Sequence, residues 1–198
     1  MKKYFLILIF LLLIPFHSWA QSPQEDKAEG VFLAIGVGPR LPIGSFANSS
    51  DLGYGFNFEL SYTNTDYIPF FIFARAGYET YPGSQGFYQQ TDYSNFSTNT
   101  LPISAGIRYY FSPLLENIVL ILPIVEVSLN YTYYQTLNQF KPSSLKSNFK
   151  DNNSKLGFNI GGGFSMFMME ILATYNYNTL NQYVALDLKV RLPLYINF

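Results

Sequence analysis

The feature that most constrains this chain is a period-two alternation of apolar residues with small or polar ones. In LGYGFNFELSY (52–62), six large apolar side chains alternate with Gly, Asn, Glu and Ser. Residues two apart lie on the same face of a β-strand, so the stretch predicts a strand with one apolar and one polar face. No segment shows the 3.6-residue period of a long amphipathic helix. The sequence therefore predicts an all-β chain.

The same alternation recurs in eight segments, many of them longer than the roughly 5–6 residues usual for strands. The predicted strands are 30–38, 52–63, 67–79, 100–112, 119–134, 154–166, 168–178 and 183–198. Their connections alternate in length. Tight turns are predicted at 64–66 and at Phe167, whereas 80–99 and 135–153 are predicted to be long loops. This alternation favours antiparallel neighbours joined in sequence order.

Residues 1–20 have the pattern of a cleaved secretory signal peptide. Two lysines precede an unbroken apolar run over 4–16, and Ser18 and Ala20 are small residues before the predicted cleavage point. The run is shorter than the roughly 20 residues that a membrane-spanning helix needs. We predict a signal peptide over 1–20, a periplasmic leader over 21–29 and one domain over 30–198.

The two faces of the predicted strands differ in charge. The apolar rows carry none, whereas the opposite rows combine Gly, Ser and Asn with nearly balanced charges: Glu59, Arg75, Glu79, Arg108, Glu126, Glu170, Asp187, Lys189 and Arg191. A narrow closed interior explains both properties, because space is tight there and each buried charge needs a partner. The apolar rows then face lipid, and the sheet must close because unpaired backbone groups are costly in hydrocarbon. The predicted fold is an eight-stranded antiparallel transmembrane β-barrel with up-and-down topology.

Prolines and aromatic residues provide two further tests of this fold. A proline cannot donate a ladder hydrogen bond, so prolines are expected near strand ends. We predict such positions for Pro39, Pro42, Pro69, Pro102, Pro123 and Pro193. Outward aromatic residues should gather where a barrel crosses the membrane interfaces. Near one set of strand ends these are Tyr54, Tyr78, Tyr131, Tyr133, Tyr175 and Tyr177, and near the other Tyr62, Tyr109, Phe111 and Phe198.

With its signal peptide, its GPRLPIGSF stretch (38–46) leading into 53–62 and its terminal Phe198, the chain resembles a known family. It is similar to the small eight-stranded outer-membrane barrels of the OmpA/OmpX-like group, especially the outer-membrane β-barrel (porin-family) proteins of Bacteroidetes-type bacteria. The resemblance implies a location in the bacterial outer membrane, with periplasmic termini, short periplasmic turns and long external loops. It also implies that Phe198 is a signal for the barrel-assembly machinery, and that outer-membrane lipid is a partner.

Enzymatic chemistry has few candidate residues. The only His (His17) lies in the predicted signal peptide and the chain has no Cys, which excludes a Ser–His arrangement and a His or Cys metal site. A carboxylate-only site built from Glu59, Glu126, Glu170 and Asp187 is the open alternative. We favour a structural network in the barrel lumen, in which these acids pair with Arg75, Arg108, Lys189 and Arg191. We expect no enzyme activity, cofactor or metal, and no nucleic-acid partner because the sequence has no basic stripe.

The predicted external loops offer a different kind of site. Residues 80–99 mix small polar residues with five aromatic ones: Tyr81, Phe87, Tyr88, Tyr93 and Phe96. Such a mixture is typical of contact surfaces. The second loop carries Lys141, Lys146 and Lys150, which suit phosphate groups or the acids of a partner. The alternative is that these loops are simply polar and variable.

These observations favour a non-enzymatic outer-membrane barrel that is structural or adhesive and acts through its external loops, with an unknown extracellular or envelope partner. A narrow pore, or a component of a transport or secretion assembly, is the alternative. An eight-stranded barrel is only wide enough to be filled by side chains, which disfavours a pore. A soluble barrel that binds lipid inside is a third possibility, disfavoured because the charged rows are predicted to face inward.

The partner of Glu59 depends on the register of the second and third predicted strands. A turn symmetric about Thr65 would place Glu59 opposite Phe71. A turn centred one residue later would place it opposite Phe73, with Arg75 at the diagonal position. Arg108, Lys189 and Arg191 are competing partners. In every register a carboxylate in a narrow interior must be paired.

Overall fold

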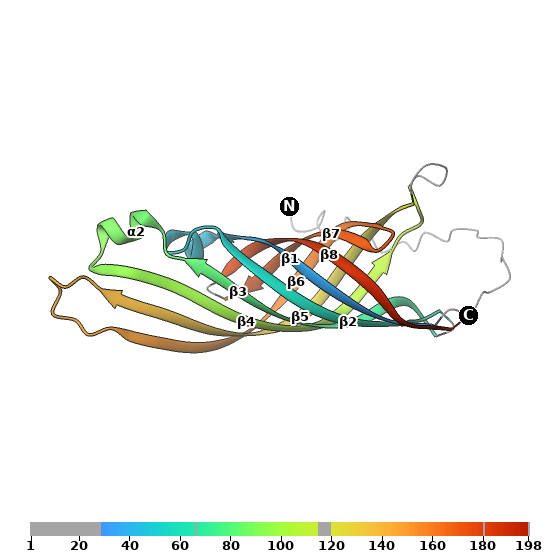
Figure 1. The fold of residues 1–198 in the computed structure, drawn as a ribbon, viewed down its shortest axis with the longest axis horizontal. Coiled ribbons are helices and arrows are strands. Elements are labelled where there is room, and N and C mark those ends of the chain that lie inside the picture. The colour runs from blue at the N-terminus through green and yellow to red at the C-terminus, as the bar shows by residue number, and fades with distance from the viewer. Residues whose placement is uncertain (1–28, 66, 115–119, 180, 198) are drawn as a thin grey trace, which may run out of the picture.

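The computed structural model describes residues 29–65, 67–114, 120–179 and 181–197. They form a closed barrel in which each strand pairs antiparallel with its sequence neighbours and β8 pairs with β1 (Figure 1). The strands are β1 (Glu29–Ile43), β2 (Gly53–Asn64), β3 (Ile68–Pro82), β4 (Tyr93–Tyr110), β5 (Ile121–Phe140), β6 (Phe149–Met166), β7 (Met169–Asn178) and β8 (Gln182–Asn197). This order confirms the predicted all-β, eight-stranded, up-and-down fold.

Two short helices complete the described fold. A 3-10 helix, η1 (Gly44–Asn48), connects β1 to β2, and α2 (Gln85–Gln90) connects β3 to β4. Among the residues that the structure describes, no helix has the length and apolar character needed to cross a membrane. The predicted signal peptide and residues 21–28 of the predicted leader lie outside the described residues. Glu29 belongs to β1 and not to the leader, so the barrel begins one residue earlier than predicted.

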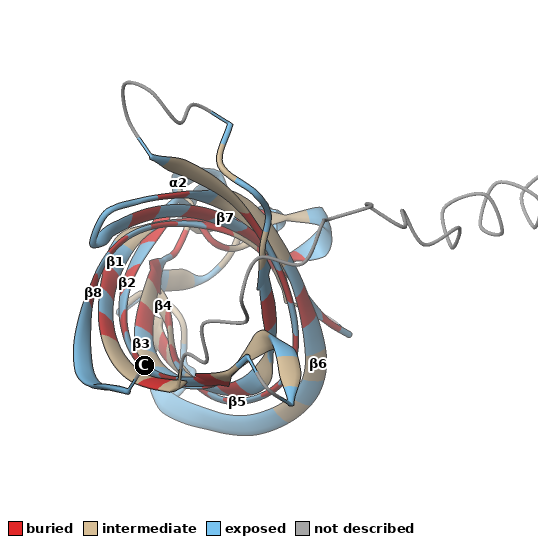
Figure 2. Cartoon of the chain, turned by 90° about the vertical axis from the view of Figure 1, so that its right-hand side faces the viewer, coloured by how far each residue is buried: buried red, intermediate tan, exposed pale blue. Residues whose placement is uncertain are grey.

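The alternation along β2 shows which face is inside. Its glycines and polar residues are buried from Gly53 to Thr63, whereas Tyr54, Phe56, Phe58, Leu60 and Tyr62 are exposed. Figure 2 looks along the barrel and shows buried and exposed bands alternating along the strands. The barrel is therefore apolar outside and polar inside, the reverse of a soluble domain.

Three strands extend past their neighbours at one end of the barrel (Figure 1). The β4–β5 ladder continues to Tyr93↔Phe140 and the β5–β6 ladder to Asn138↔Phe149, whereas the β6–β7 ladder ends at Gly157↔Asn178. We call this extension of β4, β5 and β6, with α2 and the 141–148 connection, the flap. Roughly half of 80–99 and of 135–153 is therefore strand and not loop. Polar residues continue the sheet because each strand still satisfies its neighbour's backbone groups.

Pro39 and Pro102 lie inside strands and not near the ends predicted for their segments, because β1 and β4 are longer than predicted. Pro39 is in β1, and the β1–β8 ladder has no pairs between Val37↔Leu188 and Arg40↔Ala185. Pro102 is in β4, and the β3–β4 ladder is likewise interrupted between Ala76↔Ile103 and Glu79↔Thr100. Each proline still pairs with the strand on its other side, Pro39 with β2 and Pro102 with β5. A local break in one ladder therefore accommodates the missing N–H.

Register shifts alter two predicted placements. The pair Asn64↔Ile68 fits the turn predicted to be centred one residue after Thr65. A shift between Tyr62 and Asn64 then brings Glu59 directly opposite Arg75, so neither partner predicted for Glu59, Phe71 or Phe73, was right. In the β1–β8 ladder, the register shifts between Leu192 and Tyr195 of β8, which places Tyr195 opposite Val31. Ile196 therefore leaves the predicted outward row, because one extra residue moves those that follow to the other face. The predicted role of Phe198 concerns a residue outside the described ones.

Candidate functional site

A buried network of charged side chains fills the middle of the lumen, and Glu59 is its centre. The Glu59 carboxylate accepts hydrogen bonds from Arg75 Nη2 at 2.7 Å, Arg108 Nη1 at 2.7 Å and Lys189 Nζ at 2.8 Å. Arg191 Nη2 donates to it from 3.0 Å. Glu59 lies on β2 and its partners on β3, β4 and β8, so one carboxylate joins strands across the barrel.

Two further carboxylates complete this network. Glu126 on β5 accepts hydrogen bonds from Arg75 at 2.8 Å and from Arg108 at 2.5 Å. Glu170 on β7 accepts from Arg191 Nε at 2.8 Å and from the Tyr110 hydroxyl at 2.6 Å. Three carboxylates and four cationic side chains thus form what we call the central cluster: Glu59, Glu126, Glu170, Arg75, Arg108, Lys189 and Arg191.

A second cluster surrounds Arg40, which the sequence prediction did not place in the lumen. Arg40 Nε donates to Glu79 at 2.7 Å and Arg40 Nη2 to Asp187 at 2.8 Å. Its side chain is only 2% exposed. The prolines on either side made 38–46 look like a loop. Arg40 nevertheless lies two residues after Gly38 on the inward row, so continuing the alternation would have found it.

Phenolic and hydroxyl groups add to the Arg40 cluster. Glu79 accepts hydrogen bonds from the hydroxyls of Tyr81, Tyr183 and Thr100, at 2.8, 3.2 and 3.0 Å. Asp187 accepts one from Asn57 Nδ2 at 3.1 Å. Asp187 and Glu79 therefore lie in a different cluster from the other charges predicted for the inward rows. The central cluster has formal charge +1 and the Arg40 cluster −1, so together the two are neutral.

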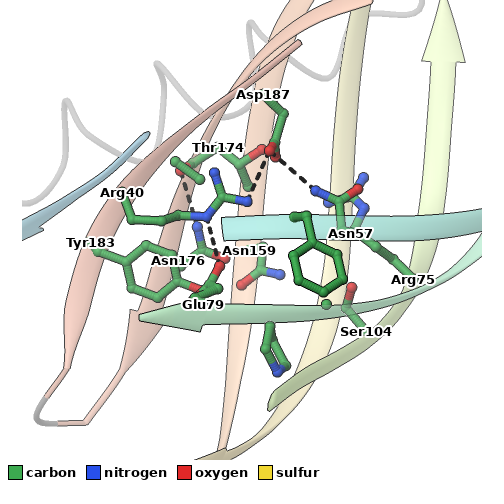
Figure 3. A pocket seen from close by; sticks show the side chains of 14 residues that line it. Arg40, Asn57, Arg75, Glu79, Ser104, Asn159, Thr174, Asn176, Tyr183 and Asp187 are labelled. Carbon is green, nitrogen blue, oxygen red and sulfur yellow. Dashed lines mark hydrogen bonds and ion pairs between the residues drawn. The ribbon is translucent and has the colours of Figure 1, made fainter. Parts of the chain in front are cut away.

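The space between the two clusters is small. A cavity of about 30 Å³ is lined by Asn57, Arg75, Glu79, Thr174 and Asp187, among others (Figure 3). A water molecule needs about 10–15 Å³ in such a cavity, so it has room for very few. Among the described side chains, Asn57 Oδ1 and Thr174 Oγ1 are buried polar atoms without a protein partner, and both residues line this cavity. The arrangement suits bound water and excludes larger solutes.

The contacts of the acids also bear on chemistry. Each of the five lumen carboxylates receives at least one hydrogen bond from an arginine or lysine. Within the described part of the chain, no group of three or more His, Cys, Asp or Glu residues is arranged to hold a metal ion. The charges are thus arranged to stabilise one another, as expected for a structural network.

Tyr81, predicted as an external contact, lies inside the barrel and is fully buried. Its ring packs against Phe46 of η1, with centroids 4.9 Å apart, and against Tyr183 of β8 at 5.6 Å. The prediction was wrong because β3 continues to Pro82, which keeps Tyr81 on the same inward row as Glu79. Together with Ala185, these rings form an apolar layer next to the Arg40 cluster.

The other predicted loop aromatics lie in the flap and pack together. Phe87 stacks on Tyr93 at 5.2 Å, Tyr93 stacks on Phe140 at 4.7 Å, and Phe96 contacts Phe87 at 5.1 Å. All are at most partly exposed. These ring contacts therefore hold α2 against the strands of the flap. Phe140 was missed because it lies beyond the predicted end of its strand.

The three predicted lysines have different surroundings. Lys141 Nζ donates to the carbonyl oxygens of Tyr88 and Thr91, at 2.9 and 2.8 Å, and so fastens the 141–148 connection to α2. Lys146 forms an exposed ion pair with Asp92 at 2.9 Å, which lowers the pKa of Asp92 and raises that of Lys146. Lys150 is exposed on β6.

The flap has two edges, and they differ. On β4, the Tyr88 hydroxyl donates to the carbonyl oxygen of Phe96 at 2.7 Å and accepts from its N–H at 3.0 Å, as a neighbouring strand would. On β6, residues 149–156 pair with β5 but lie beyond the end of the ladder with β7. One edge is therefore capped, whereas the eight residues of the other have a strand neighbour on one side only among the described residues.

Comparisons with known proteins find similar structures but no relative by sequence. No family model matches the sequence, and no curated protein does. The chain is similar in structure to Neisserial surface protein A (NspA), at 14% identity and a TM-score of 0.48, over 83% of this chain and 97% of that one. Ail, the attachment invasion locus protein of Yersinia pestis, shows 10% identity and a TM-score of 0.46, over 84% and 99%.

The N-terminal β-barrel domain of Pseudomonas aeruginosa OprF shows 13% identity and a TM-score of 0.44, over 83% of this chain and 99% of that one. At such identities and TM-scores no residue role transfers between the proteins. The roles assigned to residues of this chain therefore rest on its own contacts. The narrower resemblance to Bacteroidetes-type barrels stays a prediction.

Proposed function

We propose that this protein is a non-enzymatic, non-conducting barrel of the bacterial outer membrane that uses its flap to contact another protein. The observation that carries the proposal is the inverted distribution of polarity around a closed ring. Exposed side chains of the outward rows are large and apolar, whereas the charges lie inside and are paired. Lipid is the solvent that favours such an exterior, and closure leaves the ring without an open edge.

The interior supports a structural role more than a pore. Glu59, Arg108 and Lys189 have fully buried side chains that join opposite walls of the barrel. Phe73, also buried, has the guanidinium groups of Arg75 and Arg108 over its ring, at 4.8 and 5.1 Å. A conducting path would require this network to separate, which leaves buried charges unpaired.

The flap supports a contact role. Its free β6 edge exposes backbone N–H and C=O groups to a partner strand, which is how β-strand addition gives affinity. Lys150, Asp151 and Lys155 place charges along this edge, and such charges discourage unspecific strand pairing. The predicted signal peptide and the outward tyrosines support an outer-membrane location for the barrel that carries the flap.

Site-specific photo-crosslinking in cells tests both parts of the proposal. A photoreactive residue at Asn152 lies on the free β6 edge, and one at Gln135 lies directly opposite it, one strand further into the flap. We expect the protein in the outer-membrane fraction, with a discrete adduct from Asn152 and little from Gln135. Purified protein in planar bilayers should give no ionic current steps.

Three results would contradict the proposal. Recovery of the mature protein in the soluble periplasmic fraction would refute the membrane barrel. Stable current steps from the wild-type protein would favour the narrow pore. Equal adducts from Asn152 and Gln135 would mean that a partner covers a face of the flap, and no adduct from either would refute the contact role.

A further inference from the structure

The turn between β6 and β7 is unusual in composition. It reads Met166, Phe167, Met168 and Met169, and holds three of the four methionines of the chain. All four side chains are well exposed, Phe167 at 78%. Phe167 has a positive φ of 55°, which large side chains rarely adopt. A tight turn is expected to be polar or glycine-rich, so this composition calls for an explanation.

The β2–β3 turn provides a direct contrast at the same end of the barrel (Figure 1). In an up-and-down barrel these two turns must lie at the same end, because both follow even-numbered strands. The described residues of the β2–β3 turn are Asn64, Thr65 and Tyr67, and both Thr65 and Tyr67 are exposed, Tyr67 at 83%. The two turns at one end of the barrel therefore differ, because every described side chain of the β2–β3 turn carries a polar group, whereas those of the β6–β7 turn are all apolar.

The apolar turn is continuous with the outer wall of the barrel. Met166 and Met169 lie directly opposite one another in the β6–β7 ladder. They line a groove of about 370 Å³ whose described lining is entirely apolar: Leu114, Ile121, Phe164, Met166, Met169 and Ile171. An exposed apolar surface of this kind marks contact with lipid or with another apolar partner.

The length of β7 indicates which of these two partners the apolar turn contacts. With 10 residues, β7 is the shortest strand, close to the roughly 9–11 residues that a transmembrane strand needs. If β7 crosses the hydrocarbon layer, its Met169 end lies at the membrane boundary, and β8 continues past it to Asn197. The turn therefore continues the lipid-facing wall at the height where the membrane ends. Acyl chains are the partner that suits an apolar surface in this position.

We propose that the β6–β7 turn inserts among the acyl chains of the periplasmic leaflet and anchors this corner of the barrel. Methionine suits this position because its flexible thioether side chain adapts to irregular surroundings. The polar β2–β3 turn lies in water at the same time. The inference rests on the proposed membrane function and adds where the periplasmic boundary of the membrane lies.

Tryptophan fluorescence tests the insertion. The only Trp of the chain, Trp19, lies in the predicted signal peptide, so single-Trp variants of residues 21–198 report one site each. We would compare Phe167→Trp with Thr65→Trp in the polar turn and with Leu186→Trp, which lies opposite Ala173 on the outer wall. Each variant is folded into phosphatidylcholine vesicles with bromine near the ester end or near the methyl end of the acyl chains.

We expect bromine near the ester end to quench Phe167→Trp several-fold more than Thr65→Trp, and bromine near the methyl end to quench Leu186→Trp most. If Phe167→Trp were quenched as weakly as Thr65→Trp while Leu186→Trp was quenched, the insertion would be refuted and the membrane barrel would stand. If Leu186→Trp also escaped quenching, the membrane function would fail and the inference with it.

Discussion

Two ion pairs in this molecule have nearly the same length and opposite surroundings. Lys189 and Glu59 lie 2.8 Å apart with both side chains fully buried, and Lys146 and Asp92 lie 2.9 Å apart with both about 60% exposed. The first is part of a network that joins several strands, whereas the second joins two connections at the tip of the flap. Contact distance therefore says little about what an ion pair does for the fold.

Desolvation accounts for the difference. A buried charge that loses its partner has no water to replace it, so breaking a buried pair costs about 3–5 kcal/mol. An exposed pair exchanges each partner for water and is weakened by salt. The lumen network is thus required once the chain has placed its charges inside, and the pair at the flap tip is dispensable.

The largest effect is expected for Glu59→Ala. Within the described residues, this change removes the only hydrogen-bonding partner of Lys189 Nζ, whereas Arg75, Arg108 and Arg191 keep Glu126 or Glu170. The free energy of unfolding should fall by about 3–5 kcal/mol, measured as a shift of the urea midpoint in detergent micelles. Leu60→Ala, on the outer face of the same strand, should shift the midpoint less.

A double variant sharpens this prediction. Adding Lys189→Met to Glu59→Ala removes the unpaired charge, so it should recover part of the lost stability, because an apolar replacement of a buried pair is often nearly neutral. A silent Glu59→Ala variant would show that water reaches the central cluster and would support the pore alternative.

Arg40→Met is expected to have a smaller effect. Glu79 and Asp187 lose their shared cation, but Glu79 keeps three hydroxyl donors and Asp187 keeps Asn57. The loss, by the same urea measurement, should be smaller than that of Glu59→Ala, because donors remain on both carboxylates. A loss equal to that of Glu59→Ala would mean that the hydroxyl donors do not compensate.

Lys146→Ala should have the smallest effect. The hydrogen bond and charge of Lys146 lower the pKa of Asp92, so any stability from the pair is present above the ordinary carboxyl pKa and is lost as pH falls through the lowered value. In NMR titrations, Lys146→Ala and high salt should each raise the Asp92 pKa towards its ordinary value, with an unchanged urea midpoint. An unchanged Asp92 pKa in the variant would contradict the ion pair.

Much of the fold follows from alternation alone, because a period of two assigns each residue of a strand to a face. Alternation does not determine where pairing stops, so β4–β6 are longer than predicted and Tyr81 falls inside the barrel. It also does not reveal bulges. The register shift after Tyr62 placed Arg75 opposite Glu59, a position that neither predicted register allowed.

The charged residues of the site were more predictable than their pairing. Glu59, Arg108 and Lys189 were identified because charges at inward positions are conspicuous in an apolar sequence. Arg40 was missed because prolines obscured the strand around it. The separation into a central cluster and an Arg40 cluster depends on how far each side chain reaches across the lumen, which a sequence pattern does not contain.

The pairing of β1 with β8 has a consequence for how the barrel is made. Seven of the eight strand pairs join neighbours in sequence, but Glu29↔Asn197 joins the two ends of the described chain. Closing so long a loop is entropically the most demanding step, so the final pairing should limit the folding rate. Asp187, Lys189 and Arg191 arrive with that last strand, and until then Arg40 and Glu59 lack part of their partners. The incomplete barrel therefore holds unpaired charges that oppose its entry into lipid, which couples insertion to closure.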